Sequence, residues 1–120
     1  MKRDQDRNLR EFWKQHAAWS QEQFGTDAGP IGPLKHLEKE AREAYIEDNW
    51  HKRVDEIADC LLLTLDAARR HGLSFDELTE AAFSKLERNK QRTWPAGISD
   101  EPVEHIEVYR VRYEKDGEPT

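Results

Sequence analysis

Apolar residues recur three and four positions apart over four stretches of the chain, a spacing typical of amphipathic helices. In the first stretch, Leu9, Trp13 and His16 follow this spacing among charged residues, and we expect His16 to be a hydrogen-bonded core residue. Ser74 and Glu77 form a capping box that predicts the start of the last helix. We therefore predict helices over residues 4–23, 34–49, 52–70 and 74–91.

Glycine and proline separate or end these helices. Residues 25–33 contain three glycines and two prolines, so we expect a loop without regular structure. Trp94-Pro95 ends the last helix, because proline cannot continue the backbone hydrogen bonds. Residues 105–115 are rich in Val, Ile and Tyr, which predicts a short C-terminal β-strand. We divide the chain into a helical domain, 1–95, and a linker with a tail, 96–120.

Length and helical pattern indicate one all-α domain, and its thin core suggests that it buries further surface against copies of itself. Of the 120 residues, 36% are hydrophobic and 37% are charged, a low apolar share for a self-sufficient core. The net charge is −6, and basic residues are mixed with acids, which argues against a nucleic-acid polymer as partner. With a single cysteine, a charged N-terminus and no long apolar run, we expect a soluble, cytoplasmic protein without a membrane partner.

Carboxylates lie on the core side of two neighbouring predicted helices. Glu40 and Glu43 are three residues apart beside Ala44, and Glu56 and Asp59 repeat this spacing on the next helix. Because each residue turns a helix by about 100°, each pair shares one face. The twelve residues between the pairs allow the two helices to form an antiparallel hairpin in which the pairs converge. Facing carboxylates repel each other, whereas Mg²⁺ or Mn²⁺ prefers such oxygen ligands.

The alternative interpretation of each acid pair is a solvated helix face, which is common. Glu56 and Asp59 would also be favourable near a helix N-terminus through the helix dipole. The presence of two pairs, each beside an apolar stripe, favours the metal site.

Lys85, Asn89 and Arg92 share one face near the end of the last predicted helix. Lysine supplies a point charge, arginine a planar fork for phosphate oxygens, and asparagine both a donor and an acceptor. The alternative is a solvated helix end, where cations suit the dipole. Opposite a carboxylate-bound metal ion, this face would be suited to a polyphosphate.

Taken together, these motifs resemble those of a known enzyme family. Two acid pairs, Glu40-x-x-Glu43 and Glu56-x-x-Asp59, precede a K-x-x-x-N-x-x-R-x-W segment that begins at Lys85. This arrangement is similar to the MazG-like all-α nucleoside triphosphate pyrophosphohydrolases. The resemblance covers residues 19–95, and the stretches "GPLKHLEKEAREA" and "DEIADCLLLTLDAARRHGLS" resemble the phage-type dATP/dGTP pyrophosphohydrolase, or MazZ-like, branch most closely.

The resemblance implies metal-dependent hydrolysis of a (deoxy)nucleoside triphosphate, with a purine favoured, to the monophosphate and pyrophosphate. It implies a bundle of about four helices completed as a homodimer or homotetramer, in the cytoplasm of a bacterial host. The implied ligands of Mg²⁺ or Mn²⁺ are Glu40, Glu43, Glu56 and Asp59, with Glu40 or Glu43 accepting a proton. The implied phosphate or sugar contacts are Lys85, Asn89 and Arg92. Lys39 stands where the family pattern has a further acid, so the number of metal ions stays open.

Aromatic residues are candidates either for contacts with the base of the substrate or for packing: Trp19, Phe24, His36 and Trp94. Two other functional classes remain. A ferritin-type carboxylate-bridged metal protein uses Glu-x-x-His pairs, and neither Glu40 nor Glu56 begins one. A non-enzymatic helical interaction or regulatory protein would show no metal-dependent activity.

Overall fold

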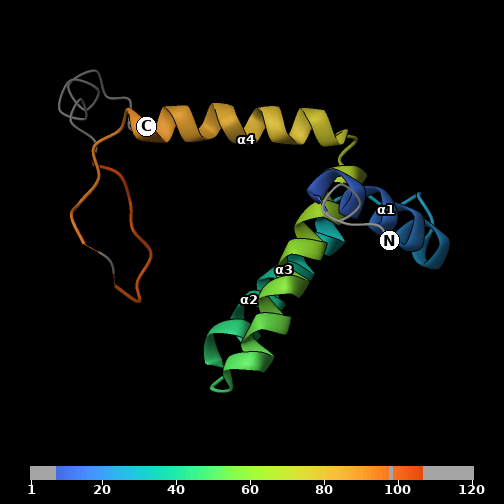
Figure 1. The fold of residues 1–120 in the computed structure, drawn as a ribbon, viewed down its shortest axis with the longest axis horizontal. Helices are drawn as coiled ribbons and strands as arrows, with labels where there is room; N and C mark the ends of the chain where they lie inside the picture. Colours follow the sequence, from blue (N-terminus) through green and yellow to red (C-terminus); the bar gives the residue numbers. More distant parts are fainter. Residues whose placement is uncertain (1–7, 98, 107–120) are drawn as a thin grey trace, which may run out of the picture. The chain divides into compact units, whose positions relative to one another are not determined.

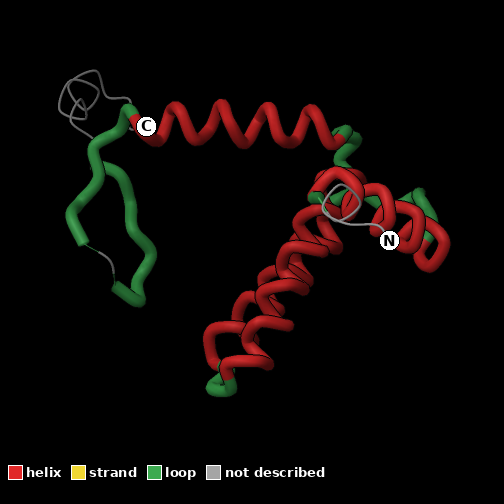
Figure 2. Tube along the Cα trace, viewed as in Figure 1, coloured by secondary structure: helices red, strands yellow, loops and turns green. Residues whose placement is uncertain are grey.

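A computed structural model describes residues 8–97 and 99–106 and shows an all-α protein. Its four helices are α1 (Leu9–Phe24), α2 (Ile31–Ile46), α3 (Trp50–Arg70) and α4 (Phe75–Lys90) (Figure 1). Loops join the helices (Figure 2), and the β-type pairing within the described residues is an isolated antiparallel bridge between Thr93 and Ile106. The predicted all-α class is confirmed, while most of the predicted strand over 105–115 lies outside the described residues.

The chain divides into two units, Met1–Thr79 and Glu80–Thr120, and each is described by itself. In the first unit, α2 and α3 lie side by side as the predicted antiparallel hairpin, and α1 packs against α3 (Figure 1). Trp13 of α1 is buried with Leu65 and Ala68 of α3. Three partly buried side chains pack against this cluster: Leu73, Phe75 and Leu78. None of the four described helices is long and apolar enough to span a bilayer.

A buried polar network connects α1 to α3. The Ser20 hydroxyl donates to Asp66 Oδ1 at 2.8 Å, and Arg69 Nη2 lies 2.7 Å both from that oxygen and from His16 Nδ1. Burial and the neighbouring Arg69 charge lower the pKa of His16 and outweigh the opposite effect of Asp66. A neutral His16 can therefore accept a hydrogen bond from the guanidinium, and the predicted core histidine is buried as expected.

The observed helix boundaries correct several predicted ones. The predicted loop over 25–33 is wrong for its last three residues, because α2 already begins at Ile31. Pro33 is tolerated there since the first-turn N–H groups of a helix lack intrahelical partners. Asn49 caps α3 by accepting from the Lys52 N–H at 3.0 Å, so this helix begins before residue 52.

The C-terminal boundaries of α2 and α4 also differ from the predicted ones, and one predicted N-terminal boundary lies beyond the described residues. In α1, Asn8 is extended and caps Glu11, so the helix begins at Leu9; the predicted start at residue 4 falls outside the described part. At their C-terminal ends, α2 stops at Ile46 and α4 at Lys90, before the predicted residues 49 and 91. Arg53 fixes the turn between α2 and α3 by donating to the Ala44 and Glu47 carbonyls.

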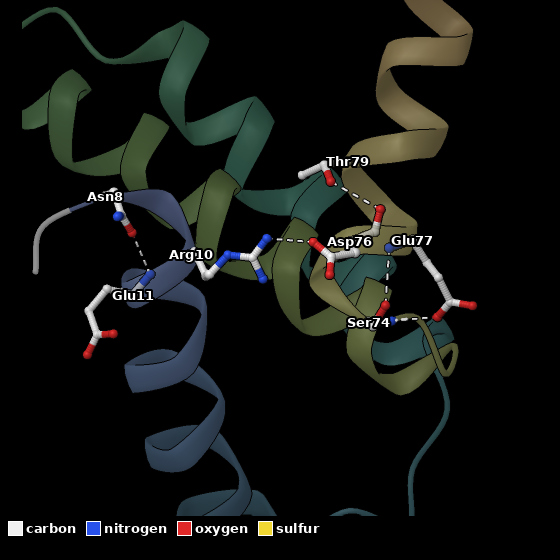
Figure 3. A network of polar contacts seen from close by, with 7 residues as sticks. All are labelled: Asn8, Arg10, Glu11, Ser74, Asp76, Glu77 and Thr79. Carbon is white, nitrogen blue, oxygen red and sulfur yellow. Dashed lines mark hydrogen bonds and ion pairs between the residues drawn. The ribbon is translucent and has the colours of Figure 1, made fainter. Parts of the chain in front are cut away.

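The predicted capping box at the start of α4 is confirmed. The Ser74 hydroxyl accepts from the Glu77 N–H at 3.1 Å, and Glu77 Oε1 accepts from the Ser74 N–H at 2.8 Å (Figure 3). In the same view, Arg10 of α1 pairs with Asp76 at 2.5 Å. The Arg10–Asp76 pair connects α1 to the first turn of α4, which belongs to the first unit.

Replacing Ser74 with alanine is expected to lower the free energy of unfolding by about 1 kcal/mol, because the N-cap hydroxyl is lost. Ser84→Ala is the matched control, since Ser84 is exposed inside α4 and alanine is favoured in helix interiors. Urea denaturation followed by circular dichroism measures both variants. Equal losses in the two variants would show that the capping box does not stabilise α4.

Candidate functional site

Three carboxylates converge between α2 and α3. One oxygen from each of Glu40, Glu43 and Glu56 lies within 4.8 Å of the other two. Helical spacing places Glu40 and Glu43 on adjacent turns of α2, and the antiparallel hairpin brings Glu56 of α3 opposite them. Asp59, one turn beyond Glu56, is exposed and does not belong to this group of three in the described structure.

The carboxylates in this cluster perturb one another. A hydrogen bond with Glu40, followed by burial and the charges of nearby carboxylates, raises the pKa of Glu56. Burial alone would raise the pKa of Glu40, but hydrogen bonds with Glu43, Glu56 and His36 outweigh it and lower the pKa. His36 Nε2 lies 3.1 Å from Glu40 Oε1. The metal-free cluster therefore holds a proton on Glu56 more readily than an isolated glutamate would.

The donor set of this cluster fits a hard divalent cation. Oε2 of Glu40 and Oε2 of Glu56 are buried and lack a hydrogen-bond partner among the described residues. Buried carboxylate oxygens without partners are costly, because they have lost their contacts with water. Mg²⁺ and Mn²⁺ take oxygen ligands of this kind, so a bound cation would supply the missing interactions.

A cavity of about 390 Å³ begins beside the carboxylates and is lined by α1, α2 and α3. Glu40 and Asp59 line one end, where His36 also contributes. The walls include aromatic and aliphatic side chains from several elements: Trp19, Phe24, Pro33, Leu62 and Leu63. Its volume lies within the range of small-molecule pockets, roughly 300–1,000 Å³.

Two charged residues that were not predicted from the sequence line the far part of the cavity. Asp66 and Arg70 follow Asp59 on α3 by seven and eleven residues and share its face. Asp66 is buried with an exposed fraction of 8%. A single acid in the apolar run from Leu61 to Ala68 was the available signal, but it has no partner at a recognisable spacing.

The predicted phosphate-binding residues gather at the end of α4, in the second unit. Asn89 Oδ1 accepts from Arg92 Nη1 at 3.1 Å, and the Asn89 carbonyl accepts from Trp94 Nε1 at 2.7 Å. Trp94 also contacts the His105 ring edge-to-face at 5.7 Å, and Lys85 is exposed. Trp94, predicted to contact the substrate, is not among the residues that line the cavity of the first unit.

Comparisons with known proteins agree with these features. The Eaa protein of Salmonella phage P22 is 47% identical over 93 residues, which cover 78% of this chain. The chain spans only 28% of the length of that protein. The dATP/dGTP diphosphohydrolase of Cyanophage S-2L is 34% identical over 90 residues, covering 75% of this chain and 80% of that protein.

A solved structure shares the fold. The Cyanophage S-2L MazG-like pyrophosphohydrolase, bound to dGDP and three catalytic Mn²⁺ ions per active site, has a TM-score of 0.67 and 31% sequence identity. The similarity covers 87% of this chain and 98% of that one. The family model of the dATP/dGTP pyrophosphohydrolases matches residues 12–110. The chain therefore belongs to the dATP/dGTP pyrophosphohydrolase family.

Proposed function

We propose that this protein hydrolyses a purine deoxynucleoside triphosphate, dATP or dGTP, to the monophosphate and pyrophosphate. The observation that carries this proposal is the group of three half-buried carboxylates beside a cavity large enough for a nucleoside. Family membership and the dGDP and Mn²⁺ bound in the similar solved structure support the same reaction class. The cleaved bond is the one between the α- and β-phosphates.

Glu40, Glu43 and Glu56 are proposed to hold Mg²⁺ or Mn²⁺, with Asp59 as a further ligand at the mouth of the cavity. Such an ion would neutralise phosphate charge, orient the pyrophosphate leaving group and make water more acidic. Glu40 and Glu43 are the candidates for accepting the proton from the attacking water. His36, which contacts Glu40 and lines the cavity, is proposed to orient that carboxylate beside the substrate.

The second unit is proposed to bind the phosphate groups of the substrate. Lys85 and Arg92 supply positive charge, and Asn89 supplies an amide whose oxygen already orients Arg92. Trp94 is proposed to hold this segment in place through its hydrogen bond to the Asn89 carbonyl. These groups would stabilise the negative charge of the triphosphate as the bond breaks.

Incubation with dGTP or dATP and Mn²⁺ is expected to release pyrophosphate, and Glu56→Gln is expected to reduce turnover about a hundredfold or more. The reason is that ligand charge worth several kcal/mol is lost, at about 1.4 kcal/mol per factor of ten. Asp55→Asn is the matched control, because it removes one charge from an exposed neighbour outside the cluster.

Product analysis by ion chromatography separates pyrophosphate from orthophosphate in this assay. Orthophosphate as the first product, or equal turnover by Glu56→Gln and Asp55→Asn, would contradict the proposed reaction. Retained folding of both variants is checked by circular dichroism.

The metal-free protein is expected to lose stability as the pH rises through the elevated pKa of Glu56. Below the ordinary carboxyl pKa, Glu56 is protonated in the folded and unfolded states, and its contribution is fully present. Between the ordinary pKa and the raised pKa, Glu56 keeps its proton in the folded state but loses it in the unfolded state. The free energy of unfolding therefore falls as the pH rises through this window. The lowered pKa of Glu40 acts in the opposite sense in a more acidic window, where stability falls as the pH decreases.

Thermal unfolding at a series of pH values, in EDTA and then in excess Mn²⁺, measures this effect. Glu56→Gln should flatten the decrease seen with the metal-free protein, and Mn²⁺ should raise the melting temperature of the unmodified protein more than that of the variant. An identical pH dependence for the two metal-free proteins would exclude the contribution assigned to Glu56.

We also propose that a second copy of the chain packs against α3, giving a homodimer or a dimer of dimers. Four apolar side chains recur on α3 at heptad spacing and remain 44–70% exposed: Trp50, Val54, Ile57 and Leu61. Helical geometry places this seam roughly opposite the face that carries Asp59 and Asp66. Such a seam is suited to packing against an equivalent helix, and it leaves the cavity accessible.

Ile57→Glu is expected to convert the assembled protein to a smaller species, because a charge would be buried in the α3 seam. Gln15→Glu adds the same charge on exposed α1 and should leave the assembly unchanged. Size-exclusion chromatography with light scattering gives the masses. A monomeric unmodified protein, or an Ile57→Glu variant that assembles normally, would contradict the proposed interface.

A further inference from the structure

We propose that Asp66 and Arg70, in the far part of the cavity, select guanine over adenine as the base of the substrate. This inference rests on the proposed nucleoside triphosphate hydrolysis and adds the specificity-determining residues. Both side chains line the cavity that begins at the carboxylate cluster. Neither contributes to the group of three carboxylates.

Asp66 has one carboxylate oxygen that protein donors hold and one that they leave open. Its Oδ1 accepts the hydrogen bonds from Ser20 and Arg69, at 2.8 and 2.7 Å. Within the described residues, Oδ2 takes part in no hydrogen bond. Because an oxygen can accept two hydrogen bonds, Oδ2 is available for two neighbouring donors of a base.

Arg70 supplies the complementary donor. It lies one turn after Asp66 on α3 and is half-buried at the edge of the same cavity. In the described part of the chain, its guanidinium has no hydrogen-bond or ion-pair partner. An unpaired guanidinium beside a fixed carboxylate gives this end of the cavity one donor group and one acceptor group.

The spacing along α3 suits a nucleoside. Asp66 follows Asp59 by seven residues, which corresponds to about 10 Å along a helix. This length is comparable to that of a nucleoside measured from its 5′ oxygen to the Watson–Crick edge of its base. A triphosphate at the carboxylate end would therefore present the edge of its base to Asp66 and Arg70.

The edge of guanine matches this pair of groups. Guanine presents the O6 acceptor, the N1–H donor and the N2 amino donor in a row. Arg70 can donate to O6 while Asp66 Oδ2 accepts from N1–H and the N2 amino group. Adenine reverses the first two positions, so its N6 amino group would face Arg70 and its N1 lone pair would face the carboxylate.

The walls of the cavity do not distinguish the bases by hydrogen bonding. Trp19 stacks on His16 at 6.2 Å and meets Phe24 edge-to-face at 5.7 Å, and all three side chains line the cavity. Stacking on aromatic rings accepts any base, because every base has a π-face. The discrimination must therefore come from groups that face the edge of the base.

The first test compares dGTP, dITP and dATP as substrates of the unmodified protein with Mn²⁺. Hypoxanthine retains O6 and N1–H but lacks the N2 amino group, so kcat/KM should decrease in the order dGTP, dITP, dATP. We expect dGTP to exceed dATP by about 10- to 100-fold, the discrimination typical of a matched pair of hydrogen bonds to a base edge. Values for dGTP and dATP within about threefold of each other would overturn the proposal.

The second test uses Arg70→Gln, which leaves the buried network around Asp66 intact. This variant should lose most of its preference for dGTP, because its kcat/KM should fall far more for dGTP than for dATP. Arg42→Gln is the matched control, because Arg42 is exposed on α2 and does not line the cavity. An equal loss for both substrates in Arg70→Gln would indicate a general electrostatic effect and would overturn the assignment.

Binding of monophosphates separates this inference from the proposed reaction. Quenching of tryptophan fluorescence is measured with dGMP and dAMP, and a Trp19→Phe variant identifies the signal from the cavity. If no triphosphate is hydrolysed, the proposed reaction fails, yet tighter binding of dGMP that Arg70→Gln abolishes would support the base assignment. Equal binding of the two monophosphates would overturn the assignment whatever the outcome of the turnover assay.

Discussion

Repulsion among the carboxylates of Glu40, Glu43 and Glu56 is the constraint on which the rest of the site depends. Three such groups within 4.8 Å, two with a buried oxygen that lacks a partner among the described residues, are unfavourable without a positive charge between them. The α2–α3 hairpin, with its turn fixed by Arg53, holds them there nevertheless. A raised Glu56 pKa relieves the repulsion only in part, which is why a divalent cation explains the arrangement better than a solvated face.

Helix α3 carries carboxylates on one face and exposed apolar side chains on another, so the two faces are suited to different ligands. One face carries Glu56 and Asp59, then Leu63, and then Asp66, so this helix can present the proposed metal ligands and the proposed base contact in order. The roughly opposite face carries exposed apolar residues suited to a second copy of the chain. Membership of the dATP/dGTP pyrophosphohydrolase family favours this enzymatic interpretation over the ferritin-type and regulatory alternatives.

Sequence periodicity was sufficient to predict the four helices and the α2–α3 hairpin, because a helix that packs against another needs apolar residues at helical spacing. The predicted start of α2 is too late, because that prediction treats proline as the end of regular structure. Proline breaks the interior of a helix, but Pro33 is compatible with the first turn of α2. Paired spacing predicted that the glutamates converge, whereas the separation of Asp59 from their group of three depends on side-chain packing that spacing cannot supply. Asp66 was missed because a single acid in an apolar run is recognisable as a ligand-facing group only when α1 is seen to close the cavity.

Anomalous diffraction from crystals grown with Mn²⁺ would show whether the three carboxylates share a cation. We expect an anomalous peak between α2 and α3, with oxygens of Glu40, Glu43 and Glu56 at coordination distance, about 2.0–2.3 Å for a small divalent cation. Data collected on both sides of the manganese absorption edge assign the peak to the metal. Absence of such a peak, with the three carboxylates turned apart toward solvent, would contradict a shared metal site.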